Sequence, residues 1–210
     1  MPVVVCYGDS NTYGYDFASA GRFPRHVRWP GAAAAALGDR YEVIEEGLNG
    51  RMTIWDDPML DGRNGRDYLL PCLRSHAPID LVILMLGTND TKGYLHLRAP
   101  DIAAGAGALV DLVLLSGTGP AGASPQVMLV APPPLGELTA ASELWGFGEA
   151  RAKSEQFARL YRTVAERRGI PFLDAGPVAE VDPADGVHLT AAGQGALGRA
   201  VAVAVRELLG

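Results

Sequence analysis

Apolar runs with the character of β-strands recur along the whole chain, and stretches with helical patterns separate them. The runs occupy residues 3–7, 41–45, 80–86, 126–131 and 171–174. Regular alternation of this kind is typical of parallel sheets whose successive strands are joined by right-handed helical crossovers. Residues 80–86 are apolar almost without a break, as expected of a central strand covered on both faces. The pattern therefore predicts an α/β fold.

The intervals between these runs carry signals for several helices. One is the Ala-rich stretch 31–37, and another begins at Asp101, a residue type that caps helices, and ends before Gly117. A third helix is expected over 154–168, where apolar residues recur on one face, and a last one after Thr190. No internal repeat interrupts the alternation, so we expect one domain over residues 1–210.

Two long segments, 51–66 and 132–150, do not fit the alternation. Both follow strands and are rich in Gly, Pro and aromatic residues, which makes them candidates for the rim or lid of a site. Their large apolar residues could equally close the ends of the core or lie in a subunit interface. These residues are Trp55, Leu144, Trp145 and Phe147.

Charge and hydropathy exclude several classes of partner. The formal net charge is −6, and acidic and basic residues are interspersed without blocks, so we expect no nucleic-acid partner. No apolar stretch approaches 18 residues and no charged leader precedes the first strand, so we expect no membrane partner and a cytoplasmic location.

The cysteines argue against a disulfide bond, and the spacing of the acidic residues argues against a metal-binding loop. Cys6 and Cys72 both lie in apolar surroundings, which suits buried free thiols better than a disulfide. Asp56, Asp57 and Asp61 are spaced too loosely for a hard-cation loop and are interpreted as a solvated loop. We expect neither a metal nor a cofactor.

Three short polar segments carry the chemistry. Gly8-Asp9-Ser10-Asn11 and Gly87-Thr88-Asn89-Asp90 each follow an apolar strand, and Asp185-Gly186-Val187-His188 lies near the end of the chain. The carboxyl ends of parallel strands meet at one edge, where open sheets bind ligands. A hydroxyl nucleophile, a base, a carboxylate that orients the base, and oxyanion donors can meet there, and acyl transfer requires these parts.

Each motif also has a structural explanation when taken alone. Ser10 could be only a helix N-cap, and Gly-Thr-Asn-Asp is good turn chemistry. A catalytically silent flavodoxin-like module that binds a small anion at the Ser10 helix terminus is the alternative from another class. The Asp185–His188 pair argues against it, because a binding module has no need of such a pair. Asp182 is the second candidate partner for His188.

Taken together, these blocks and Gly47-Leu48-Asn49-Gly50 make the chain resemble an SGNH hydrolase of the GDSL esterase family over its whole length. The resemblance implies a three-layer α/β/α flavodoxin-like fold with a five-stranded parallel sheet in the order 2-1-3-4-5. It also implies that Ser10 is the nucleophile, His188 the base and Asp185 its partner. The oxyanion donors implied are Gly50, Asn89 and the N–H of Ser10.

Further stretches, such as Val27-Arg28-Trp29 and Pro132-Pro133-Pro134-Leu135, are similar to the bacterial arylesterase and acyltransferase branch of that family. Its members are compact oligomers that act on small acyl esters, which implies a homo-oligomer, a dimer or an octamer, with a small ester as substrate. Asn11 stands where the family has a leucine. The predicted pocket residues are Asp9, Asn11, Tyr13, Tyr15, Trp145 and Val187.

The leading hypothesis is a serine esterase, with possible acyl transfer, that acts on short acyl groups of aryl or sugar acetates. Because Asn11 would be a polar amide beside the nucleophile, a long apolar chain would leave it poorly paired, and Asn11→Leu is expected to relax the chain-length preference. A lysophospholipase or thioesterase that takes longer acyl chains is the alternative.

Overall fold

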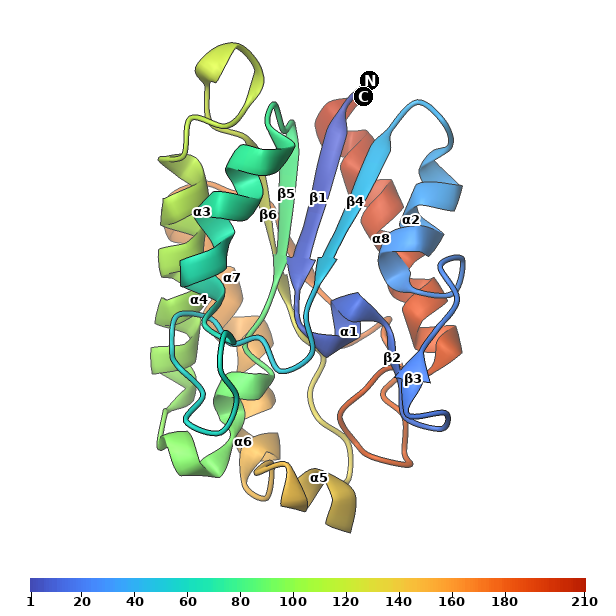
Figure 1. Ribbon diagram of the computed structural model, residues 1–210, viewed down its shortest axis with the longest axis vertical. Coiled ribbons are helices and arrows are strands. Elements are labelled where there is room, and N and C mark those ends of the chain that lie inside the picture. Colours follow the sequence, from blue (N-terminus) through green and yellow to red (C-terminus); the bar gives the residue numbers. More distant parts are fainter.

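The computed structural model describes residues 1–210, and its centre is a five-stranded parallel sheet (Figure 1). The strands lie in the order β4-β1-β5-β6-β7, which among these five is 2-1-3-4-5, so the expected fold is confirmed. Their bounds are Val3–Gly8 for β1, Glu42–Gly47 for β4, Leu81–Met85 for β5, Gln126–Ala131 for β6 and Phe172–Asp174 for β7. A separate hairpin pairs β2 (Tyr15–Asp16) with β3 (Gly21–Arg22).

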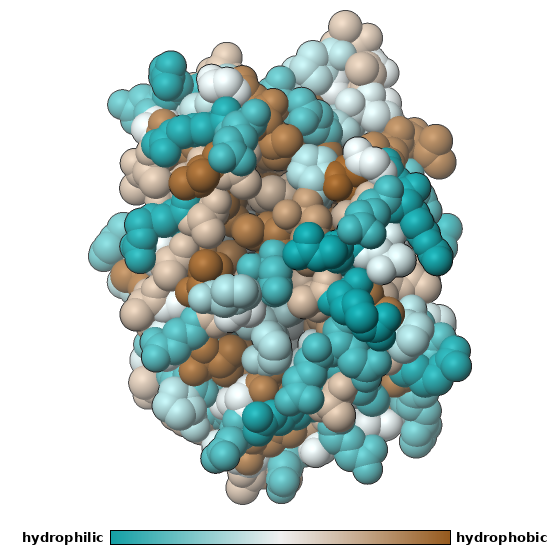
Figure 2. Space-filling view, turned by 180° about the vertical axis from the view of Figure 1, so that it is seen from behind, coloured by the Kyte–Doolittle hydropathy of each residue, from teal (hydrophilic) through white to brown (hydrophobic).

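Helices cover both faces of the sheet. On one face lie α2 (Trp29–Leu37) and α8 (Ala191–Leu209), and on the other lie α3 (Gly65–His76), α4 (Ala99–Leu114) and α7 (Phe157–Arg168) (Figure 1). None of the helices combines the length and the apolar character needed to cross a membrane. In the rear view of Figure 2, hydrophobic residues are interspersed among hydrophilic ones.

The alternating direction of strand side chains supplies two separate cores. In β5, Leu81, Ile83 and Met85 pack toward α2 and α8, while Val82 and Leu84 pack toward α3, α4 and α7. Both sets are buried, which explains why this run is apolar at every position. Cys6 and Cys72 fall in opposite cores and are not bridged to each other.

The predicted helices are present, but some of their ends differ from expectation. α4 begins at Ala99 with Arg98 as its N-cap, and the carboxylate of Asp101 reaches back to accept the N–H of Arg98 at 3.1 Å. Asp101 therefore lies in the first turn and is not the N-cap. Thr190 does cap α8, because its hydroxyl accepts the N–H of Gly193 at 3.0 Å.

The region expected to form one helix over 154–168 is split. It contains the end of α6 (Ala150–Ser154), and α7 starts only at Phe157. The segment 132–150 also contains a short helix, α5 (Ala140–Leu144), and 51–66 leads into α3.

All of the short elements near the site gather at the carboxyl edge of the sheet. Figure 1 shows α1 (Ser10–Tyr13), the β2–β3 hairpin, α5 and α6 below the strand ends. Two short helical turns, η1 (Asn89–Thr91) and η2 (Gly93–Leu95), follow β5 at this edge, whereas η3 (Pro120–Gly122) precedes β6 and therefore lies at the opposite, amino edge. The three polar motifs thus meet on this edge, as the parallel topology predicts.

Candidate active site

Ser10 is placed by a tight passage from β1 into α1. The carboxylate of Asp9 caps the helix by accepting the N–H of Asn11 at 2.9 Å. A Cβ on Gly8 would lie 2.0 Å from the Thr12 hydroxyl and 2.7 Å from the Met85 carbonyl, so only glycine lets the helix fold this closely onto the strands. Ser10 is 7% exposed and lies at the surface of a cavity.

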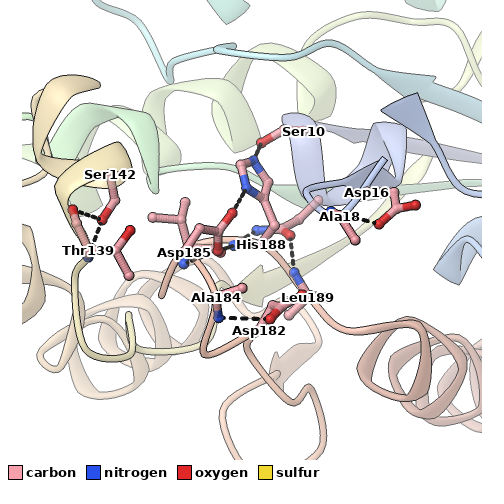
Figure 3. A network of polar contacts seen from close by, with 12 residues as sticks. Ser10, Asp16, Ala18, Thr139, Ser142, Asp182, Ala184, Asp185, His188 and Leu189 are labelled. Carbon is pink, nitrogen blue, oxygen red and sulfur yellow. Dashed lines mark hydrogen bonds and ion pairs between the residues drawn. The ribbon is translucent and has the colours of Figure 1, made fainter. Parts of the chain in front are cut away.

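His188 is held on a turn that Asp185 organises. One carboxylate oxygen of Asp185 accepts the N–H groups of Val187 and His188, at 2.8 and 2.9 Å, and the other lies 2.5 Å from His188 Nδ1. Gly186 adopts a φ of +72°, which favours glycine, and thereby lets the chain fold back. His188 Nε2 lies 3.0 Å from Ser10 Oγ, which completes a continuous chain of polar contacts (Figure 3).

The electrostatics of this chain favour an ionised Asp185. Burial by itself would raise the pKa of Asp185, but the hydrogen bonds from His188 and Val187 outweigh burial and leave that pKa lowered. A negative charge is therefore fixed beside Nδ1. Asp182, the second candidate, accepts only the N–H of Ala184, at 2.9 Å, and lies on the exposed side of the loop.

Three potential oxyanion donors face the same cavity. The N–H groups of Ser10 and Gly50 are not hydrogen-bonded within the protein, and both residues line the cavity with Asn89. Gly50 has a φ of +79°, and Asn89 donates one amide hydrogen to the carbonyl of Arg51 at 3.1 Å. The second hydrogen of the Asn89 amide is left for a ligand.

Arg51 holds the loop that carries Gly50 in place. Its guanidinium donates to the carbonyl of Gly8 at 3.0 Å and lies 4.1 Å from the ring centre of Tyr7. The loop that carries Gly50 is thereby tied to the strand that carries Ser10, which explains why the three donors converge.

The cavity itself has a volume of about 570 Å³ and is largely apolar. The rings of Tyr15 and Trp145 lie 4.5 and 5.7 Å from that of His188. The full lining is Ser10, Tyr15, Asn49, Gly50, Met59, Leu60, Arg63, Asn89, Lys92, Tyr94, Leu144, Trp145, Gly146, Phe147, Val187 and His188.

Three of the six predicted pocket residues line this cavity, namely Tyr15, Trp145 and Val187, and three do not. Asp9 is buried as the helix cap, and burial raises its pKa to about 6. Tyr13 packs against Arg22, whose guanidinium carbon lies 4.1 Å from the ring centre.

Asn11 was also predicted to line the pocket, and the structure places its side chain elsewhere. It is 1% exposed, and its side chain contacts the main chain of Val187 and Leu189 rather than the cavity. Successive residues of a helix point about 100° apart, so a neighbour of Ser10 in sequence does not share its direction. Asn11 therefore does not contact the acyl group in the way that the sequence interpretation assumed.

A buried ion pair in the cavity wall was missed in the sequence. Lys92 Nζ lies 2.9 Å from a carboxylate oxygen of Asp57, and the Tyr94 hydroxyl donates to the same carboxylate at 3.0 Å. The Asp57 side chain is 0% exposed, so its interpretation as part of a solvated loop is wrong. The pairing could not be predicted from the sequence, because Asp57 and Lys92 lie 35 residues apart.

Three side chains with donor atoms suited to a metal ion lie outside the cavity. Glu46, Cys72 and His76 bring donor atoms within 4.8 Å of one another on the α3 side of the sheet.

The comparisons with known proteins agree with this geometry. The family model described as the GDSL-like lipase/acylhydrolase family matches residues 6–196. Est24, a carbohydrate acetylesterase from Sinorhizobium meliloti, is 42% identical with a TM-score of 0.94, and the match covers 100% of each chain. The native aryl esterase of M. smegmatis is 43% identical with a TM-score of 0.94, again over 100% of each chain.

A more distant structure shares the fold alone. It is a member of the lipolytic protein G-D-S-L family from Veillonella parvula, at 17% identity and a TM-score of 0.70 over 100% of each chain. The comparison with curated proteins gave no significant match. With its family model matched over nearly the whole length, the chain belongs to the GDSL-like lipase/acylhydrolase family.

Proposed function

We propose that this protein is a serine esterase that hydrolyses short acyl groups of small esters, such as aryl or sugar acetates, through an acyl-enzyme. The observation that carries the proposal is the unbroken contact chain from Asp185 through His188 to Ser10 on the wall of an open cavity. An acetylesterase and an aryl esterase among the similar structures support the same reaction class.

The geometry supports the following sequence of proton transfers. Ser10 Oγ attacks the ester carbonyl while His188 Nε2 accepts its proton, and Asp185 holds the Nδ1–H and so fixes the tautomer. His188 then gives the proton to the leaving alcohol. Water repeats the cycle on the acyl-enzyme and releases the acid.

The oxyanion that forms at each stage would be stabilised by the N–H groups of Ser10 and Gly50 and by the Asn89 amide. Each such donor contributes on the order of 3 kcal/mol to the transition state. The donors are fixed before the substrate arrives, because Arg51 and the β1–α1 junction hold them in the free protein.

The preference for small esters rests on the cavity. Tyr15 and Trp145 crowd His188, so the space next to the reacting carbon is bounded by rings on that side. A volume of about 570 Å³ must hold both the acyl and the alcohol group. The apolar lining would also favour alcohols over water as acyl acceptors, and thus some transfer.

A fluorophosphonate probe tests the nucleophile directly. We expect one label per chain at Ser10, and none in Ser10→Ala. The control is Ser124→Ala, which removes an exposed hydroxyl bonded to the Leu114 carbonyl and should leave labelling unchanged. Labelling at any other serine would reject the proposed mechanism.

A panel of p-nitrophenyl esters from acetate to palmitate tests the substrate class. We expect kcat/KM to be highest for acetate and butyrate and to fall steeply by octanoate. A preference for dodecanoate or longer would instead indicate the lysophospholipase or thioesterase class.

A further inference from the structure

Three unlike donor groups meet between the sheet and α3, away from the cavity. Glu46 comes from β4, and Cys72 and His76 lie four residues apart on α3. A carboxylate oxygen, the thiol sulfur and an imidazole nitrogen all lie within 4.8 Å of one another. His76 Nε2 is 2.8 Å from Glu46 Oε1.

The three side chains of this cluster differ in their exposure to solvent. Cys72 is 0% exposed, whereas the side chains of Glu46 and His76 are 18% and 28% exposed. Residues four apart share one face of a helix, so Cys72 and His76 both point toward Glu46. An ion entering from solvent would first meet the partly exposed His76 and Glu46, with the buried Cys72 thiol behind them, and water could occupy a fourth position on the open side.

We propose that Glu46, Cys72 and His76 form a binding site for one divalent cation of borderline softness, with Zn²⁺ as the best match. Nitrogen, sulfur and carboxylate oxygen are the donors that Zn²⁺ takes, with three protein ligands and a water in open sites. Bonds of ~2.0–2.3 Å in tetrahedral geometry place the ligand atoms about 3.5 Å apart. The separations here, from 2.8 Å to no more than 4.8 Å, bracket that value.

Binding requires a defined change in protonation. The Cys72 thiol releases its proton to solvent as the sulfur binds, and His76 binds through Nε2 with its remaining proton on Nδ1. Arg51 lies nearby, but its guanidinium donates to the main-chain carbonyls of Gly8 and Glu46. The Glu46 carboxylate is therefore not paired with Arg51, and its contact with His76 would be exchanged for bonds from both residues to the metal. Burial and the nearby Glu46 carboxylate raise the pKa of the Cys72 thiol to about 12, so the metal itself has to displace the thiol proton.

The site joins the edge strand to a helix. β4 pairs only with β1, so one of its sides has no neighbouring strand. A metal held by Glu46 and α3 would fasten this strand just before the loop that carries Gly50. Binding to the folded state alone raises thermal stability, so the melting temperature should increase with Zn²⁺.

Titration with Co²⁺ tests the site, because a cobalt–thiolate bond gives a charge-transfer absorption that carboxylate and imidazole ligands do not. Untagged protein freed of metal with a chelator should develop this band up to one equivalent, and Zn²⁺ should abolish it. Cys72→Ser should lose the band, and His76→Gln should weaken cobalt affinity at least tenfold.

The matched controls are Cys6→Ala, the other buried thiol, and His26→Gln, an exposed histidine; both should retain the band. His76 is partly exposed, so its variant keeps the test decisive even where Cys72→Ser folds poorly. Absence of a thiolate band in the wild type, or a band that His76→Gln leaves unchanged, would overturn the proposal. Cobalt bound without that band would place the ion elsewhere, as at Asp185 and His188, and would overturn it equally.

Discussion

The side chain of Asn11 is bonded to the main chain on both sides of His188. Its Nδ2 donates to the carbonyl of Val187 at 3.3 Å, and its Oδ1 accepts the N–H of Leu189 at 3.0 Å. Gln194 extends the contact, because its amide donates to the carbonyl of Asn11 at 3.0 Å. The helix that carries Ser10 thus holds the loop that carries His188.

We therefore expect Asn11→Leu to lower kcat by about tenfold or more, because small displacements of a base cost much of its efficiency. The ratio of acetate to octanoate activity should stay as in the wild type, contrary to the sequence expectation for this variant. Asn11→Asp, which keeps Oδ1 but loses the donor to Val187, should show a related loss of kcat. Kinetics on both esters decide this, and a flattened chain-length profile would restore a pocket role for Asn11.

Asp185→Asn should reduce kcat on the order of 10⁴-fold, as errors of tautomer do in Ser-His-Asp triads. The reason is that Asp185 alone accepts the Nδ1–H of His188. Asp182→Asn is the matched control, since that carboxylate contacts only Ala184 N, and it should retain near-full activity. Equal losses in the two variants would contradict the assignment.

Asp90 should make the protein less stable as the pH rises. Burial raises its pKa from 3.8 to about 6, even though the N–H and hydroxyl of Thr53 donate to it. A carboxyl whose pKa is raised on folding contributes stability below the unfolded value, and this contribution is lost as the pH rises through 6. At about 1.4 kcal/mol per pKa unit, the loss is about 3 kcal/mol.

In urea unfolding, the stability of Asp90→Asn relative to the wild type should therefore increase from pH 4 to 7.5. Asp101→Asn is the control. The Arg98 side chain lowers the pKa of Asp101 to about 2, so the stability difference between this variant and the wild type should stay nearly constant from pH 4 to 7.5. A pH-independent difference for Asp90→Asn would show that its carboxyl ionises normally.

The Lys92–Asp57 pair should behave as one unit in stability. Its side chains are 6% and 0% exposed, so removing one partner leaves a buried charge, at a cost of about 3–5 kcal/mol. Lys92→Met and Asp57→Asn should each destabilise by about that amount, and the double variant by clearly less than their sum. Additive losses in urea unfolding would mean that the two groups do not interact.

Self-association is expected from the rim of the cavity. Met59, Leu60, Leu144 and Trp145 are 71%, 44%, 88% and 36% exposed around the cavity mouth. Light scattering should give a mass above the 22.1 kDa of one chain, and Leu144→Glu should reduce it. Leu115→Glu, which alters a residue 84% exposed at the far end of α4, should leave the mass unchanged. A monomer mass for the wild type would reject the interface.

One residue that the sequence suggested for that interface, Phe147, is buried within a single chain. Phe147 does not require a second subunit to become buried, because it packs with Leu135, Ala150 and Val187 inside one chain. The exposed rim residues carry the expectation instead.

Whether a feature could be predicted from the sequence depends on how far apart in the sequence the interacting residues lie. The five strands and their parallel direction are encoded in local apolar runs and in the alternation with helices, so they were accessible. Their order came only from the resemblance to the SGNH family. Asp185 and His188 were also accessible, because they lie only three residues apart in the sequence. The helix α3 was not predicted, since it contains Pro71, a residue type that disfavours helix interiors, and only Gly65, Leu69, Cys72 and Leu73 are buried.

Interactions between distant segments were beyond such patterns. Asp57 looks like any loop aspartate until the fold brings Lys92 to it, and Asn11 looks like a neighbour of the substrate until the helix turns it away. In both cases the direction of the side chain decides its role, and direction depends on tertiary contacts.

The contact between Ser10 and His188 spans 178 residues, with the hydroxyl near the start of the chain. During synthesis the hydroxyl leaves the ribosome long before its base exists, and at ~5–20 residues per second the interval is about 10 to 40 s. Over that time the Ser10 hydroxyl has no His188 imidazole beside it. The Ser10–His188 pair, and with it the base that the proposed mechanism requires, can therefore form only after the segment that carries His188 has been made.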